Sequence, residues 1–151
     1  GEKIGEATLG LAELVCLDAD SQRVCDYTPG YIDIHNHPGS GCALFSPGDM
    51  DYYLSNRVGV GIVVTKKYAC VIRLTQECWA NAEKLSTEFH KLNVRFQISP
   101  AALNPFTSSQ KLAKLVEDWG EQHGMSCFQM PIQKFLDNCD QICSGTESWQ
   151  D

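Results

Sequence analysis

The feature that most constrains this chain is a short β-branched and aromatic run that ends in two histidines. The run Tyr31–Ile34 predicts a buried strand. It continues into the tetrapeptide His-Asn-His-Pro at residues 35–38, in which the proline ends the strand because it has no N–H to donate. Side chains two residues apart on a strand point to the same face. We therefore expect His35 and His37 to lie side by side at the end of this strand.

A carboxylate follows at a position from which it can reach both histidines. Ser46 is typical of a helix N-cap, Pro47 of the first helical position and Asp49 of an acid in the first turn. They predict a helix over about residues 47–57. Because strand C-termini and helix N-termini meet at the same edge of an α/β layer, we expect the Asp49 carboxylate to turn back toward the imidazoles.

Two imidazoles and one carboxylate are the usual protein share of a catalytic zinc site, with the fourth position left open for water. The sequence therefore predicts Zn²⁺ bound by His35, His37 and Asp49. The competing interpretation is an ordinary capping box at Ser46 and Asp49, beside a polar strand end that binds no metal.

The other polar candidates are given smaller roles. Asp33 and Asn36 are expected to face away from the metal or to flank it, and either could orient a ligand. His90 lies in an amphipathic pattern and is expected to be a solvated or packing residue. His123 is expected at a helix end, where a cation suits the helix dipole.

Composition limits the class of partner. With 43% hydrophobic and 21% charged residues, a chain of 151 residues can bury a real core. The net charge of −7 disfavours nucleic acid and anionic membranes as partners. Neither a membrane-spanning run nor a signal-peptide pattern is visible. The eight cysteines fall mostly in apolar patterns and are expected to be free, buried thiols.

Residue patterning predicts an α/β (α+β) fold, with a mixed sheet flanked by helices. The expected further strands are residues 4–9, 11–17, 58–65, 69–74, 94–98 and 126–130, and the expected further helices are residues 76–92, 108–119 and 132–143. We expect residues 1–93 to form a metal-binding domain. Residues 94–151 would form a C-terminal α/β extension packed on it.

The motif His-Asn-His-Pro at residues 35–38, followed by Ser46-x-x-Asp49, resembles the JAB/MPN (JAMM) metalloprotease family. Bacterial and phage members of that family often combine His-Asn-His-Pro, a glycine/serine loop and Ser-x-x-Asp. The resemblance covers roughly residues 10–75. The gap between His37 and Asp49 is eleven residues, one more than is usual in the family. The resemblance implies a JAB/MPN-like fold with cytidine-deaminase-like layering.

The resemblance also implies an activity and further roles. It implies hydrolysis of peptide or isopeptide bonds, including those of ubiquitin-like tails, by a protein of the cytoplasm or by a delivered or secreted effector. It implies that Ser46 donates a hydrogen bond to the oxyanion. The family places its general-base Glu well upstream of the first histidine. Here Glu6 is the first choice for that role, because it opens a run that ends in glycine. Glu13 is the second choice and Glu2 the third.

Two alternatives remain open. A JAB-like fold that lacks a well-placed general base could serve as a catalytically weak binding or structural module. In addition, residues 29–37 resemble the first-strand signature of barrel amidohydrolases, in which His-x-His binds a metal. Such a barrel needs about 250 residues, so this chain would be only a fragment of one.

Overall fold

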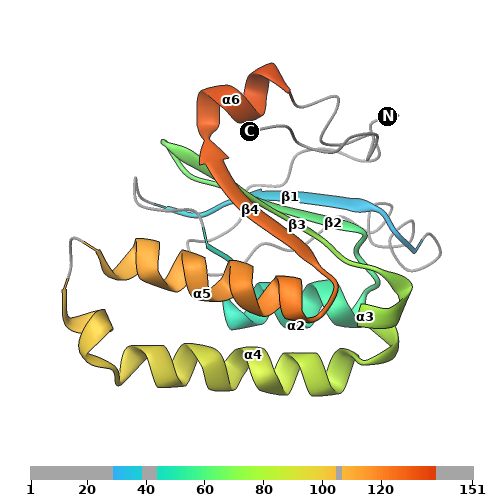
Figure 1. The fold of residues 1–151 in the computed structure, drawn as a ribbon. Helices are drawn as coiled ribbons and strands as arrows, with labels where there is room; N and C mark the ends of the chain where they lie inside the picture. The colour runs from blue at the N-terminus through green and yellow to red at the C-terminus, as the bar shows by residue number, and fades with distance from the viewer. Residues whose placement is uncertain (1–28, 39–43, 105–106, 139–151) are drawn as a thin grey trace.

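The strands form a single mixed sheet with helices on both faces (Figure 1). The computed structural model describes residues 29–38, 44–104 and 107–138. The strands are β1 (Ile32–Asn36), β2 (Val60–Val64), β3 (Tyr68–Arg73) and β4 (Ser126–Pro131), in that spatial order. β1 pairs with β2 in parallel, and the other two pairs are antiparallel. The predicted mixed sheet flanked by helices is confirmed.

Most of the helices cover one face of this sheet. The helices are α2 (Pro47–Ser55), α3 (Gln76–Ala80), α4 (Ala82–Gln97), α5 (Ser108–Gln122) and α6 (Ile132–Asp137), with a 3₁₀ turn η1 (Pro100–Leu103). α2, α4 and α5 lie on one side of the sheet and α6 lies on the other (Figure 1). None of the helices in the described ranges is both long and apolar enough to cross a bilayer.

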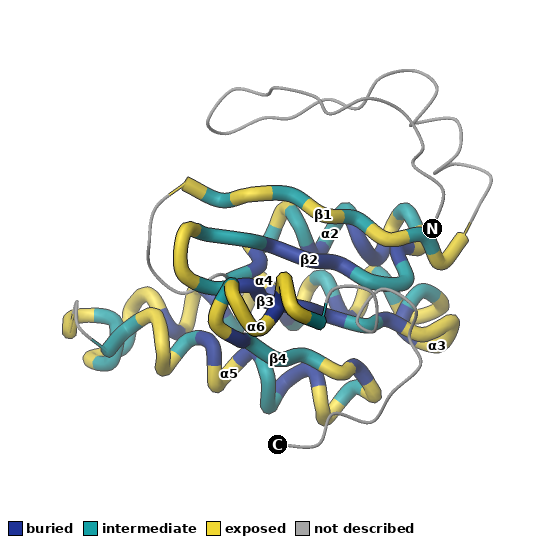
Figure 2. Tube along the Cα trace, turned by 90° about the horizontal axis from the view of Figure 1, so that it is seen from above, coloured by how far each residue is buried: buried dark blue, intermediate teal, exposed yellow. Residues whose placement is uncertain are grey.

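Two hydrophobic clusters hold these layers together. The larger one lies between the sheet and α2, α4 and α5, and its fully buried members include Met50, Tyr53 and Phe89. The smaller one joins Val71 and its neighbours to Phe135 of α6. Burying each large side chain contributes about 1.5–3 kcal/mol. Buried residues are concentrated in the two central strands β2 and β3, whereas exposed and half-buried residues alternate along β1 (Figure 2).

Two element predictions differ from the structure. The predicted strand over residues 94–98 is wrong, because α4 continues to Gln97. Leu85, Phe89 and Phe96 keep the helical spacing of this buried face, and Val94 is exposed on the other side. The helix expected over residues 76–92 is interrupted at Asn81, which separates α3 from α4.

The sequence also predicts a division of the chain into two parts, two strands near the N-terminus, and free cysteines. The expected division between residues 93 and 94 falls inside α4, and β4 pairs with β3 in the same sheet. The strands expected over residues 4–9 and 11–17 lie outside the described residues. Within the described residues, Cys70 and Cys78 are free and buried, as expected, whereas Cys127 is free but half-buried.

The order of the elements along the chain brings the end of β1 and the start of α2 to the same edge of the sheet. β1 and β2 are parallel, with α2 between them in sequence. The carboxyl end of β1 and the amino end of α2 therefore lie at the same edge of the layer. His37 is fixed at this edge, because its backbone N–H donates to the carbonyl oxygen of Val64 at 2.9 Å.

Candidate metal centre

Strand β1 and the residue that follows it carry the two histidines on one face: His35 lies in β1 and His37 directly after its end. Asp33, His35 and His37 are half-buried, whereas Ile34 and Asn36 are exposed. The imidazole rings of His35 and His37 lie with their centroids 5.0 Å apart and their Nε2 atoms 3.2 Å apart. The predicted side-by-side arrangement is confirmed.

The start of α2 brings the carboxylate of Asp49 to these rings. Ser46 is the N-cap residue, and its hydroxyl oxygen accepts the backbone N–H of Asp49 at 3.1 Å. Asp49 Oδ1 lies 3.2 Å from His35 Nε2, and Asp49 Oδ2 lies 3.3 Å from His37 Nε2. From the sequence, a capping box and a metal ligand are competing interpretations of Asp49, but in the structure the same carboxylate closes the capping box and faces the imidazoles.

These three side chains form a group that could hold a metal ion. One potential ligand atom from each of His35, His37 and Asp49 lies within 4.8 Å of the other two. Within residues 29–38, 44–104 and 107–138, this is the only group of three or more histidine, cysteine or acidic residues with that property. Their side chains are 18–29% exposed, so the group is partly buried but open to solvent on one side.

Asp33 determines which nitrogen of His35 faces the group. Its Oδ2 atom lies 2.8 Å from His35 Nδ1. With its proton on Nδ1, a neutral imidazole donates to this carboxylate and leaves the Nε2 lone pair directed at His37 and Asp49. Asp33 therefore lies on the same face as the ligands and can orient one of them. Asn36 is exposed on the opposite face and does not.

The electrostatics of the group favour a positive charge at its centre. Two ring nitrogens and a carboxylate converge at 3.2–3.3 Å, and without a proton or a cation between them their electron pairs would repel one another. Burial opposes the charge on His35, but hydrogen bonds to Asp33 and Asp49 outweigh it and raise its pKa to about 9. Burial likewise opposes the charge on Asp49, whose pKa is lowered because hydrogen bonds with His35, His37 and Ser46 dominate. A bound metal cation would place positive charge where this proton does, and the same groups would stabilise it.

Of the predicted catalytic residues, the structure describes Ser46 but not the candidate glutamates. Ser46 is exposed at the α2 N-terminus, where its hydroxyl oxygen accepts a hydrogen bond from Asp49, and its role toward an oxyanion stays a prediction. Glu6, Glu13 and Glu2, the three choices for general base, lie outside the described residues.

Sequence analysis missed Tyr53 as a residue of this site. Tyr53 is fully buried, and its hydroxyl oxygen lies 3.5 Å from His35 Nδ1. Its signal in the sequence is its position four residues after Asp49, which places both side chains on the same face of α2. The pattern alone predicts only a core tyrosine, because the partners of the hydroxyl come from β1.

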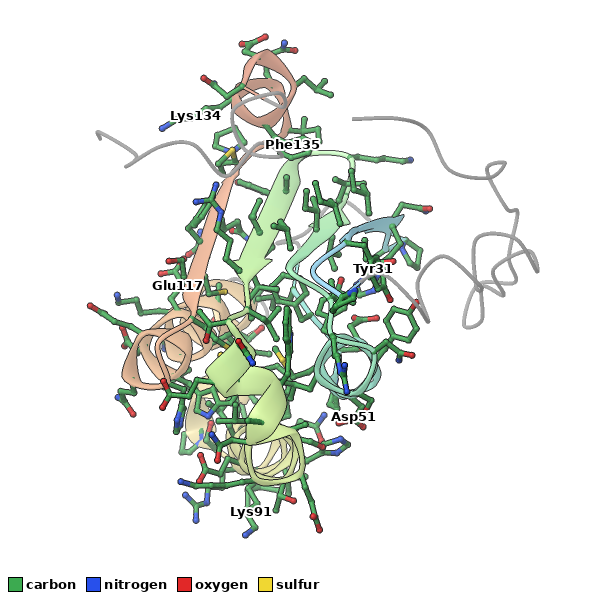
Figure 3. The ribbon with its side chains drawn as sticks, turned by 90° about the vertical axis from the view of Figure 1, so that its right-hand side faces the viewer. Tyr31, Asp51, Lys91, Glu117, Lys134 and Phe135 are labelled. Atoms are coloured by element: carbon green, nitrogen blue, oxygen red, sulfur yellow. The ribbon has the colours of Figure 1, made fainter. Side chains whose placement is uncertain are left out.

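The other two described histidines bind acidic residues away from this group. His90 Nε2 lies 2.8 Å from Asp51 Oδ2, which joins α4 to α2, and Ser86 of α4 donates to the other oxygen of Asp51 at 2.5 Å. Asp51 lies where α2 approaches α4 (Figure 3). His123 Nε2 lies 3.0 Å from Glu88 Oε2. His90 is exposed, as expected for a solvated residue, and His123 is the C-cap residue of α5, in agreement with its predicted place at a helix end.

Comparison of the chain with protein-family models, with curated proteins and with solved structures gives no match.

Proposed function

We propose that this protein is a zinc-dependent hydrolase of peptide or isopeptide bonds, of the JAB/MPN (JAMM) type. The observation that carries the proposal is the convergence of His35 Nε2, His37 Nε2 and the Asp49 carboxylate at one edge of the sheet. The mixed, helix-flanked sheet and the position of the ligands at a strand end and a helix start are compatible with such a fold.

The spacing of the three ligand atoms supports zinc. Donor atoms bound tetrahedrally at about 2.0–2.1 Å lie about 3.3 Å apart from one another. The observed separations are 3.2 Å between the two Nε2 atoms, 3.2 Å from His35 to Asp49 and 3.3 Å from His37 to Asp49. Three protein ligands of the nitrogen and oxygen type also leave one position of the tetrahedron for water or substrate.

Each residue has a defined task in the proposed reaction. When bound, zinc supplies Lewis-acid polarisation of the scissile carbonyl and makes water more acidic. Asp33 fixes the ring of His35 so that Nε2 faces the metal position. The hydroxyl of Ser46 can still donate its proton while its oxygen accepts from Asp49, so it can bind a developing oxyanion. Glu6 is proposed to accept the proton of the attacking water, with Glu13 and Glu2 as the alternatives.

The test begins with metal content. We expect the purified protein to bind about one equivalent of zinc by elemental analysis, as one three-ligand site requires. His37→Ala should abolish this binding, whereas His90→Ala removes a histidine outside the group and should retain it. Peptide or ubiquitin-chain cleavage that a chelator stops and zinc restores would establish the activity. A wild-type protein that takes up no zinc would contradict the proposal.

A binding or structural module is the second candidate. It is favoured by one observation: Asp49 already has a structural task, because it closes the capping box of α2. Zinc-loaded protein that binds a peptide or a ubiquitin-like protein without cleaving it, and whose binding is unchanged in Glu6→Gln, would establish this alternative. The barrel-fragment alternative is disfavoured because β2, β3 and β4 are antiparallel, whereas such a barrel is parallel throughout.

A further inference from the structure

A tyrosine ring occupies the space that a side chain at residue 61 would fill. Gly61 is the partner of Asp33 in the parallel pairing of β1 with β2, so a side chain there would point to the same face as Asp33. A Cβ atom on Gly61 would lie 2.3 Å from Cε2 and 2.5 Å from Cζ of Tyr53. These separations are shorter than any van der Waals contact. The ring of Tyr53 therefore reaches the sheet only because residue 61 is glycine.

The hydroxyl end of this ring meets the pair formed by Asp33 and His35. The Tyr53 oxygen lies 3.5 Å from His35 Nδ1, at the outer limit of hydrogen bonding, and that nitrogen already has Asp33 Oδ2 at 2.8 Å. The Tyr53 hydroxyl therefore lies against the edge of the His35 ring at which Asp33 is bound.

We propose that Tyr53 is a positioning residue of the metal centre. Its hydroxyl lies against the Nδ1 edge of the His35 ring, where it supports the contact with Asp33 that directs Nε2 at the metal position. The opening at Gly61 allows this contact to cross from α2 to β1. This inference rests on the proposed metal-binding function, and it adds a partner that lies outside the ligand set. Outer partners that orient a ligand typically account for about 10–100-fold in metal affinity.

A merely structural tyrosine would behave differently. The ring of Tyr53 also packs edge-on against Phe45, with centroids 5.6 Å apart, and near Tyr52 at 6.2 Å. Those contacts need the ring and not the hydroxyl. Tyr53→Phe keeps the ring and removes only the oxygen, so it separates packing from positioning.

The experiment compares zinc affinity, measured by competition with a chromophoric chelator, across matched variants. Tyr53→Phe should weaken zinc binding about 10-fold, and Asp33→Asn about 10–100-fold. Tyr52→Phe is the control, because its hydroxyl lies on the same helix but pairs with the Tyr31 hydroxyl at 2.9 Å. It should stay within about twofold of the wild type. The visible absorption spectrum of the cobalt-substituted protein should change in the first two variants and not in the third.

A double variant tests whether the two residues act through one another. If Tyr53 acts only by supporting the contact between His35 and Asp33, then Tyr53→Phe combined with Asp33→Asn should bind zinc no more weakly than Asp33→Asn alone. Losses that multiply would show that the two residues act independently, which would overturn the proposed chain of contacts. Gly61→Ala should weaken zinc binding at least as much as Tyr53→Phe, because the added methyl group displaces the ring.

The possible failures are distinguishable. Wild-type zinc affinity and an unchanged cobalt spectrum in Tyr53→Phe, in a wild-type protein that does bind zinc, would overturn the role of Tyr53 and leave the metal site intact. A wild-type protein that binds neither ion would overturn the metal site and the inference with it. If Tyr53→Phe does not fold, as judged by circular dichroism, the near-isosteric Asp33→Asn decides the matter, since unchanged affinity there would break the same chain.

Discussion

The backbone N–H of Ser46 donates a 2.6 Å hydrogen bond to Oδ2 of Asp49, the same oxygen that lies 3.3 Å from His37 Nε2. One carboxylate therefore stabilises the start of α2 and completes the potential metal site. The capping box of α2 thus holds the Asp49 carboxylate beside the imidazoles.

This dual role predicts different outcomes for two substitutions of Asp49. Asp49→Asn keeps an oxygen that can accept from Ser46, whereas Asp49→Ala removes it. Both should abolish zinc binding, because the anionic ligand is lost. Asp49→Ala should be less stable than Asp49→Asn by about 0.5–2 kcal/mol in chelator, a range typical of helix caps. Urea unfolding at neutral pH measures the difference, and equal stability of the two variants would contradict the capping role.

The stability of the metal-free protein should decrease at alkaline pH. The pKa of His35 is raised from 6.5 to about 9 in the folded state, so protonation of His35 stabilises the fold. That contribution is complete below about pH 6.5 and is lost as the pH rises through about 9. Urea unfolding in chelator across this interval should show the loss, and His35→Gln should not. A wild-type stability that does not change over this interval would contradict the predicted shift.

Asp49 predicts a loss on the acid side. Its pKa is lowered in the folded state from an ordinary value of 3.8, so its ionised form stabilises the fold. The contribution is present above about pH 4 and decreases as the pH falls below it. The same unfolding series, extended into acid, measures this loss, and Asp49→Asn should show a smaller one than the wild type.

Zinc should raise the thermal stability of the wild-type protein. At a free concentration one hundred times its dissociation constant, a ligand that binds only the folded state adds about 2.7 kcal/mol. For a chain of this size the midpoint should rise by about 5–10 °C. His37→Ala should show no such shift, whereas His90→Ala should show the wild-type response. A shift in His37→Ala equal to that of the wild type would place zinc elsewhere.

The contact between α2 and α4 predicts a small stability effect that is separate from the metal site. Ser86 donates to Asp51 at 2.5 Å, and His90 lies 2.8 Å from the other oxygen. Ser86→Ala should cost about 0.5–1.5 kcal/mol. His90→Ala should cost less than about 1 kcal/mol, because the pair is exposed. Neither variant should change zinc affinity, and a large loss of affinity in Ser86→Ala would show that the two regions are coupled.

The ligand positions could be predicted because each follows from a local rule. Strand periodicity places His35 beside His37, and capping chemistry places Asp49 at the start of α2. The role of Tyr53 could not be predicted in this way. It depends on a glycine in β2 lying opposite Asp33 in β1, and that register is set by strand pairing between distant parts of the chain.

The error at the end of α4 has a related cause. Val94, Phe96 and Ile98 alternate with polar residues and so match a strand over a short window. Phe96 also continues the buried row formed by Leu85 and Phe89, and this longer period extends the helix. A window of five residues cannot distinguish the two periods, whereas packing against the core does.

The three proposed ligands come from one continuous stretch, residues 35–49, which is 15 residues when both ends are counted. Insertions or exchanges in β3, β4, α5 or α6 would leave this stretch unaltered. The other elements can therefore diverge in related chains, while the segment proposed to bind a cation is inherited as a unit.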